Sequence, residues 1–160
     1  MTTIKFNRIL SALLSALVRD KDKLAIVEGQ RDKNALLKLG FSSILILNKA
    51  NKSFHSRIED IIKELKERAS KARTNKARTR AAKTKMECII LTDFDKEGKA
   101  LYAQLKNALT REGIKINDSL RRILFKAGIS HIEGLATYLL NSKLCLNSKL
   151  CKTGVICQKL

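Results

Sequence analysis

Two short apolar segments, each ending in acidic residues, constrain the fold of this chain more than any other feature. The first covers residues 24–27 and leads into Glu28, and the second covers residues 88–92 and leads into Asp93 and Asp95. Apolar runs of this length bounded by turn residues are typical of strands that are buried on both faces of a sheet. The carboxyl ends of such strands are where open α/β sheets bind ligands. The pattern therefore predicts an acidic site at the edge of a buried sheet.

The remaining apolar segments alternate between strand and helix patterns, which is typical of βαβ units. We expect an α/β fold: a three-layer sandwich with a mostly parallel central sheet of about four strands and helices on both faces. The expected strands cover residues 24–27, 44–47, 88–92 and 114–116. The expected helices cover residues 3–18, 32–39, 97–112 and 133–140, with two more that begin at the caps Ser56 and Asp118.

At 160 residues the chain is expected to form one domain with appendages. We divide it into an N-terminal amphipathic helix at 1–21, a domain at 22–140, and a cysteine-containing tail at 141–160. Residues 9–18 loosely resemble a signal peptide, but their leucines repeat at helical spacing, which favours a helix packed on the domain. No apolar stretch is long enough to span a membrane. The cysteines do not follow zinc-ligand spacings, and we expect a reduced, cytoplasmic protein.

The charge balance favours a polyanionic partner. There are 33 Lys and Arg residues against 15 Asp and Glu, giving a net charge of +18. Nucleic acid is the first expectation and an anionic membrane surface the second. Residues 68–85 form a basic insertion without acids, expected to be either a disordered loop or a helix extension that orders against phosphate. Its candidate nucleic-acid contacts are Arg68, Lys71, Arg73, Lys76, Arg78, Arg80, Lys83 and Lys85.

The acids after the two strands predict a magnesium site. Alternation along an extended segment sends Asp93 and Asp95 to one side and Phe94 into the core. Two such carboxylates suit Mg²⁺, with Mn²⁺ as an alternative ion. Glu28 would face the pair from a neighbouring strand, either as a third metal ligand or as a group that moves a proton. Gly98 would let the backbone bend close to the site.

These motifs resemble those of the Toprim domain. The likeness rests on residues 27–29 with Asp32 three residues on, and on residues 92–98, which look like the family's DxDxxG motif. It covers about residues 22–112, and the likeness to small stand-alone archaeal Toprim proteins of unassigned activity extends through residues 120–122 and 130–135. The resemblance implies a Rossmann-like fold. Asp32 matches an acid of the family's primase and nuclease branches, although from the residues alone a helix cap is the favoured reading.

The resemblance also implies a role for each matched residue. Glu28 would be the family's glutamate, which is proposed as a general acid or base. Asp93 and Asp95 would be its magnesium-binding pair, and Gly29 and Gly98 its turn glycines. The basic insertion is longer than the usual link between the two motifs.

Three functions remain open from the sequence. The first is a magnesium-dependent nuclease or related phosphotransferase acting on RNA or DNA. The second is a non-catalytic nucleic-acid-binding or adaptor module that uses magnesium to bridge phosphate, with a protein or ribonucleoprotein partner. The third and weakest is a structural protein on an acidic surface such as a ribosome. A topoisomerase is disfavoured because Tyr102 and Tyr138 have no second domain to present them, and His55 and His131 are assigned no role.

Overall fold

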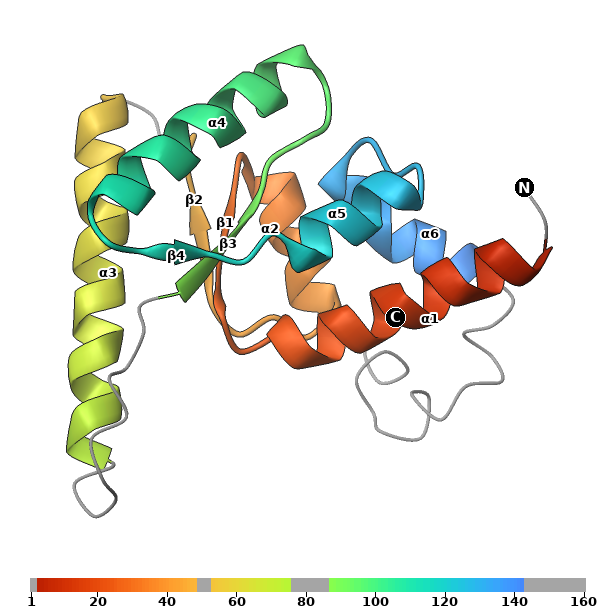
Figure 1. Cartoon of the computed structure of the whole chain (residues 1–160), viewed down its shortest axis with the longest axis horizontal. Coiled ribbons are helices and arrows are strands. Elements are labelled where there is room, and N and C mark those ends of the chain that lie inside the picture. Colours follow the sequence, from red (N-terminus) through yellow and green to blue (C-terminus); the bar gives the residue numbers. More distant parts are fainter. Residues whose placement is uncertain (1–2, 49–52, 76–86, 143–160) are drawn as a thin grey trace.

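The sheet of this protein has four parallel strands in the order β2-β1-β3-β4. The computed structural model describes residues 3–48, 53–75 and 87–142. The strands are β1 (Leu24–Val27), β2 (Ile44–Ile46), β3 (Glu87–Leu91) and β4 (Lys115–Ile116). All four predicted strands are present, and the predicted α/β sandwich with a parallel sheet is confirmed (Figure 1).

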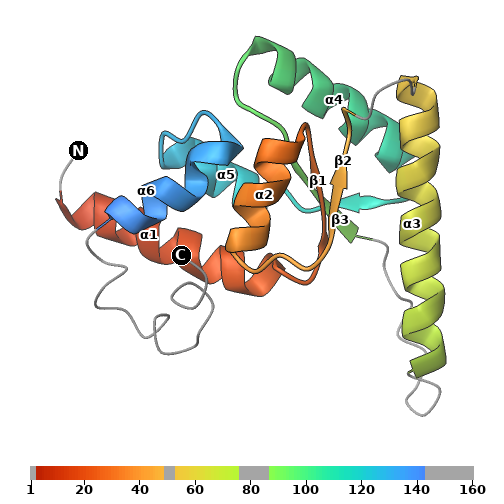
Figure 2. The same ribbon diagram turned by 180° about the vertical axis from the view of Figure 1, so that it is seen from behind.

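Helices cover both faces of the sheet, as the crossovers between parallel strands require (Figures 1 and 2). Two lie on one face: α3 (Phe54–Asn75) and α4 (Lys96–Arg111). The other face is covered by α1 (Thr3–Asp20), α2 (Gln30–Lys38), α5 (Ser119–Lys126) and α6 (Leu135–Asn141), with a 3₁₀ turn, η1 (Ile132–Gly134), before α6. None of the helices in the described ranges is long and apolar enough to cross a membrane.

The two central strands contribute to two separate hydrophobic cores. Ala25 and Ile89 point toward the side of α1, α2 and α5, whereas Ile26 and Ile90 point toward α3 and α4. Successive strand side chains alternate between faces, so a strand covered on both sides has to be apolar throughout. Cys88 belongs to the second core, where burial raises the pKa of its thiol to about 12. It behaves there as a small hydrophobic side chain.

Helix α1 is part of the first core. Its residues Leu10, Leu13 and Leu17 are buried against that face of the sheet. At its end the fully buried Asp20 carboxylate forms ion pairs with Arg19 at 2.8 Å and with Lys23 at 3.0 Å. Burial alone would raise the pKa of Asp20, but these hydrogen bonds outweigh burial and lower it. The ion pairs fix the end of α1 next to the start of β1.

Two predicted helix starts differ from the structure. Asp32 was expected to cap its helix, but α2 begins earlier, and Asp32 lies in its first turn and accepts a hydrogen bond from the Gly29 N–H at 3.0 Å. Helix α3 also begins earlier than Ser56, whose N–H donates to Ser53 Oγ at 3.2 Å. In both cases the helix start lies before the predicted cap, and a side chain bonds a backbone N–H three positions away. Sequence alone does not show which of two polar residues at this spacing is the cap.

A third predicted cap, Asp118, is the N-cap residue of α5, as expected, but not through its side chain. Its carboxylate makes no capping bond but accepts hydrogen bonds from Tyr102 and Lys106, and Asn117 Oδ1 accepts from the first helical N–H of α5 instead. The predicted end of α2 is confirmed. Gly40 has a positive φ of 85°, and Phe41 is buried against the first core.

The basic insertion begins as a helix. Helix α3 continues to Asn75, and Arg68 pairs with Glu64 on the same helix at 2.8 Å. Lys71 and Arg73 lie in the last turns of α3. The other candidate contacts, Lys76, Arg78, Arg80, Lys83 and Lys85, fall outside the described residues, as does the tail from 143 onward.

Gly98 allows the first turn of α4 to pack directly on the end of β3. A Cβ atom at this position would lie 2.4 Å from the Asp93 carbonyl oxygen and 2.8 Å from Glu28 Oε1. The Asp93 carbonyl oxygen has little freedom to move, because Asp93 lies just after the end of the buried strand β3. The predicted need for glycine at this position therefore has a steric cause.

We predict that Gly98→Ala lowers the free energy of unfolding by about 1–3 kcal/mol, the usual cost of forcing a methyl group into packed structure. Gly134→Ala is the matched control, because its backbone is helical and nothing lies within 4 Å of the added Cβ. That variant should be neutral or slightly stabilising. Urea unfolding measures both, and equal stability of the two variants would contradict the steric account.

Candidate metal site at the ends of β1 and β3

The two acidic motifs meet at the carboxyl-terminal edge of the sheet. Val27 of β1 pairs with Leu91 of β3, so both strands end at the same level. Just beyond them the Asp93 N–H donates a hydrogen bond to Glu28 Oε1 at 3.0 Å. Two residues that are 65 positions apart in sequence are thereby held in direct contact, as the strand positions predicted.

Asp95 lies two residues after Asp93 and caps helix α4. Its Oδ1 accepts a hydrogen bond from the Gly98 N–H at 2.7 Å. The buried Thr92 hydroxyl donates to the Gly98 carbonyl oxygen at 2.8 Å and closes the turn between β3 and α4. Within the described part of the chain, Asp95 Oδ2 and Glu28 Oε2 accept no hydrogen bond. Each of these carboxylates therefore has an oxygen available to a cation.

The Asp93 carboxylate is oriented by the segment that precedes α6. Its Oδ1 accepts a hydrogen bond from the Ile132 N–H at 3.0 Å, and its Oδ2 lies 2.8 Å from His131 Nδ1. The hydrogen bond to Asp93 raises the pKa of the exposed His131 imidazole above its usual value. Sequence reasoning assigned this histidine no role, because it has no metal-ligand spacing to any other residue.

Arg121 supports the acidic loop from behind. Its buried guanidinium donates hydrogen bonds to the carbonyl oxygens of Thr92 and Asp93, the latter at 3.1 Å. It is sandwiched between the Phe94 and Tyr102 rings, at 4.4 Å and 4.3 Å from their centroids. Burial lowers the pKa of Arg121, although the group stays charged at neutral pH. Neither its burial nor its partners could be found from the sequence, in which it is one of many basic residues.

Two acids of the cluster, Glu28 and Asp32, have raised pKa values. Burial raises the pKa of Glu28, and the negative charges of Asp93, Asp95 and Asp32 add to that effect. Burial also raises the pKa of Asp32, with further contributions from Asp93 and Glu133. The cluster is therefore short of positive charge, which is the electrostatic condition under which a cation binds.

The donor chemistry fits Mg²⁺, which prefers carboxylate oxygens. Among the described residues no group of three or more His, Cys, Asp or Glu side chains is arranged to hold a metal ion. Mg²⁺ is usually bound through one or two carboxylates, several waters and the phosphates of a substrate, rather than by a cage of protein ligands. The predicted ligands Asp93, Asp95 and Glu28 lie at the same edge of the sheet, but they do not form a closed site.

The basic insertion does not flank this cluster. Helix α3 runs antiparallel to the strands, so that its basic end lies toward the amino-terminal edge of the sheet, opposite the acids (Figure 1). The described part of the basic insertion therefore lies away from the acids. Other cations, Lys99 of α4 and Arg122 of α5, line a cavity together with Phe94 of the acidic loop.

Comparison with known proteins gives three matches. The Toprim domain model matches residues 23–127. A UPF0292 protein of Methanocaldococcus jannaschii is 28% identical over 136 residues, which cover 83% of this chain and 91% of that protein. A solved structure of a protein from Aquifex aeolicus superimposes with a TM-score of 0.54 and 23% identity, covering 79% of this chain and 94% of the other. The last likeness concerns the fold alone.

Toprim domains usually bind Mg²⁺ and act in the metal-dependent processing of nucleic acids. In this chain the match includes both acidic motifs, the buried strands before them and the arginine behind them. By this match and by the contact between Glu28 and Asp93, the chain belongs to the Toprim domain family.

Proposed function

We propose that this protein is a magnesium-dependent enzyme that cleaves or transfers phosphodiester bonds in RNA or DNA. The contact between Glu28 and the Asp93 backbone carries the proposal, because it brings three carboxylates to one edge of a sheet in a strongly basic protein. An acidic cluster of this kind repels a polyanion unless a divalent cation lies between them.

Each acid has a distinct part in this proposal. Asp93 and Asp95 would hold the ion. Asp95 keeps a free oxygen while it caps α4, and Asp93 is held in place by Ile132 and His131. Bound Mg²⁺ would neutralise charge on the phosphate. Glu28 is suited to proton transfer, because burial and the neighbouring acids raise its pKa toward neutral pH. A general acid or base works best when its pKa lies near the working pH.

A non-catalytic adaptor is the alternative. It would need the acids only to bridge phosphate through magnesium, and a raised pKa of Glu28 would serve no purpose in it. The cleavage experiment below separates the two functions, because an adaptor would bind labelled nucleic acid in magnesium without cutting it.

We predict metal-dependent cleavage of end-labelled RNA or DNA that is lost with EDTA and restored by Mg²⁺ or Mn²⁺. Asp95→Asn should greatly reduce cleavage without unfolding the protein, because asparagine is as good a helix cap as aspartate. Glu28→Gln should slow cleavage by about 100- to 10,000-fold, the usual contribution of a general acid or base. Asp22→Asn, at an exposed acid in the turn before β1, is the control. Full activity in the Glu28→Gln, Asp95→Asn double variant would refute the assignment.

We also predict that Glu28→Gln stabilises the metal-free protein at neutral pH. A carboxyl group whose pKa is raised on folding adds stability below its unfolded pKa and loses it as the pH rises through its folded pKa. At pH 7 the ionised Glu28 is therefore a cost, while glutamine keeps an oxygen for the Asp93 N–H.

Thermal unfolding in EDTA measures this effect, and the difference between wild type and variant should vanish at a pH below the usual carboxyl pKa. Adding Mg²⁺ should raise the melting temperature of the wild type more than that of Glu28→Gln. Glu67→Gln, at an exposed position of α3, should change neither result. A destabilised Glu28→Gln variant in EDTA at pH 7 would show that the acids do not repel one another as described.

A further inference from the structure

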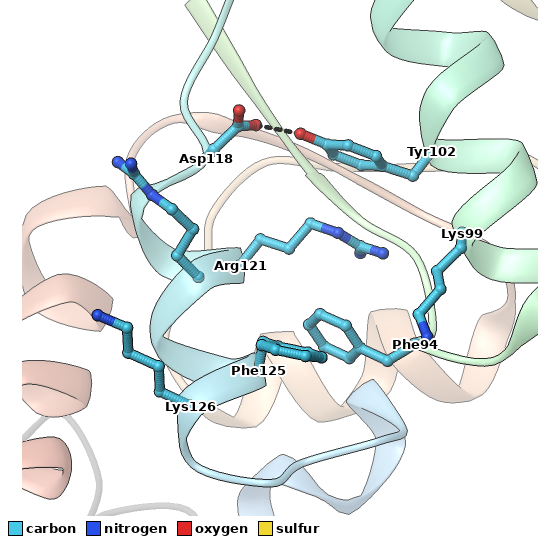
Figure 3. A pocket seen from close by; sticks show the side chains of 8 residues that line it. Phe94, Lys99, Tyr102, Asp118, Arg121, Phe125 and Lys126 are labelled. Atoms are coloured by element: carbon cyan, nitrogen blue, oxygen red, sulfur yellow. Dashed lines mark hydrogen bonds between the residues drawn. The ribbon is translucent and has the colours of Figure 1, made fainter.

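A cavity of about 400 Å³ is lined by Phe94, the residue between Asp93 and Asp95, and by residues of α4 and α5 (Figure 3). Three aromatic rings line it: Phe94 from the acidic loop, Tyr102 from α4 and Phe125 from α5. Its volume falls in the range of small-molecule sites, which is about 300–1,000 Å³. The chain has seven aromatic residues and no tryptophan, so a large share of its aromatic surface lies at this one place.

The ring of Phe125 is presented to solvent. Its side chain is 63% exposed, whereas Leu120 and Leu124 of the same helix are buried. It lies 5.8 Å from the Phe94 ring, centroid to centroid, with the two planes tilted by 42°. An exposed aromatic ring next to a second one offers a flat ligand a face on which to stack.

The rim of the cavity is positively charged. Lys99, Arg122 and Lys126 line it, and none of the three forms an ion pair with another described residue. The acid in the lining, Asp118, is already neutralised by Lys106 at 2.5 Å and also accepts a hydrogen bond from the Tyr102 hydroxyl. The cavity therefore combines an aromatic wall with unpaired cations, which suits a flat ring that carries a negative charge.

The cavity shares residues with the acidic loop. Phe94 stands between Asp93 and Asp95 in the chain, and Arg121, in the cavity wall, holds the carbonyl oxygens of Thr92 and Asp93. A ligand stacked here would contact Phe94 and Arg121, and both of these residues also belong to or hold the acidic loop. This placement links what binds in the cavity to what reacts at the acids.

We propose that this cavity binds an unpaired nucleobase of a nucleic-acid strand, with the adjoining phosphate on the Lys99, Arg122 and Lys126 rim. The proposal rests on the proposed function and adds its substrate class, a single-stranded segment or frayed end. Bases inside a duplex are stacked on one another and cannot enter a pocket without being extruded. The preference for single strands would therefore come from stacking on Phe125 and Phe94. The affinity for nucleic acid of any kind would come from the cations.

A single introduced tryptophan tests the stacking directly. Because the chain lacks tryptophan, Phe125→Trp places one fluorophore in the cavity. We expect a single-stranded oligonucleotide in EDTA to quench its fluorescence, and inorganic polyphosphate of matched charge to leave it unchanged. Leu37→Trp, at an exposed apolar position of α2, is the control and should not respond. Equal quenching by polyphosphate, or none by the oligonucleotide, would overturn the proposal.

Binding affinities give the second test. Phe125→Ala should weaken single-strand binding by roughly 5- to 150-fold, the range expected for one stacked base, and should leave binding of a blunt duplex unchanged. Phe125→Trp should retain binding, whereas Phe125→Leu, which is apolar without a π-face, should behave like Phe125→Ala. Full binding by Phe125→Leu would overturn the proposal and indicate a hydrophobic partner such as a protein side chain. A mononucleotide that binds as tightly as the oligonucleotide would reassign the cavity to free nucleotides.

These measurements are independent of catalysis. Binding is measured in EDTA, so a protein that cuts nothing can still show quenching and a Phe125-dependent single-strand preference. Conversely, metal-dependent cleavage with no effect of Phe125→Ala on single-strand binding would leave the proposed function standing and remove the cavity from it.

Discussion

The parallel pairing of β1 with β3 is the constraint on which the rest of this structure depends. Because Val27 and Leu91 are paired, the chain leaves both strands at the same height, and Glu28 can accept a hydrogen bond from the Asp93 N–H. The side-chain period of a strand is two, so a shift of one residue in either strand would exchange the two hydrophobic cores. The register that pairs Val27 with Leu91 is thus also the one that brings the acids together.

The acidic edge is stabilised mainly by hydrogen bonds with its backbone, in addition to the ion pair of Asp93 with His131. Arg121 binds carbonyl oxygens of the loop, Asp95 caps α4, and Asp32 bonds the Gly29 N–H. These contacts fix where the carboxyl groups lie but leave the pKa of Glu28 raised by its neighbours. Natural proteins break local stability rules chiefly at functional sites, where the rigid surroundings offset the cost. The edge is well hydrogen-bonded, yet its negative charges are only partly compensated. This is the physical argument that the edge binds a cation.

Much of this arrangement could be predicted from the sequence because it is local or periodic. The buried runs before Glu28 and Asp93 identify central strands, and the steric need at Gly98 follows from a sharp turn into a helix. Arg121, His131 and Phe125 could not be assigned, because their surroundings are set by how α5 and the segment after it return to the sheet. The apolar stripe of a helix indicates that it has a buried face, but not which charged residue that face carries inward or which aromatic ring it leaves outside.

The topology also separates two sources of positive charge. A crossover helix runs antiparallel to its strands, so the basic end of α3 is carried to the amino-terminal edge, while Lys99 and Arg122 line the cavity that Phe94 of the acidic loop also lines. Screening at physiological salt limits the reach of an exposed charge to about 8 Å. Under the proposed function, the cations on α4 and α5 are therefore better placed than the end of α3 to contact a phosphate near the acidic loop. The end of α3 would meet a different stretch of a long polyanion, and it would contribute affinity without setting the position of the bond at the acids.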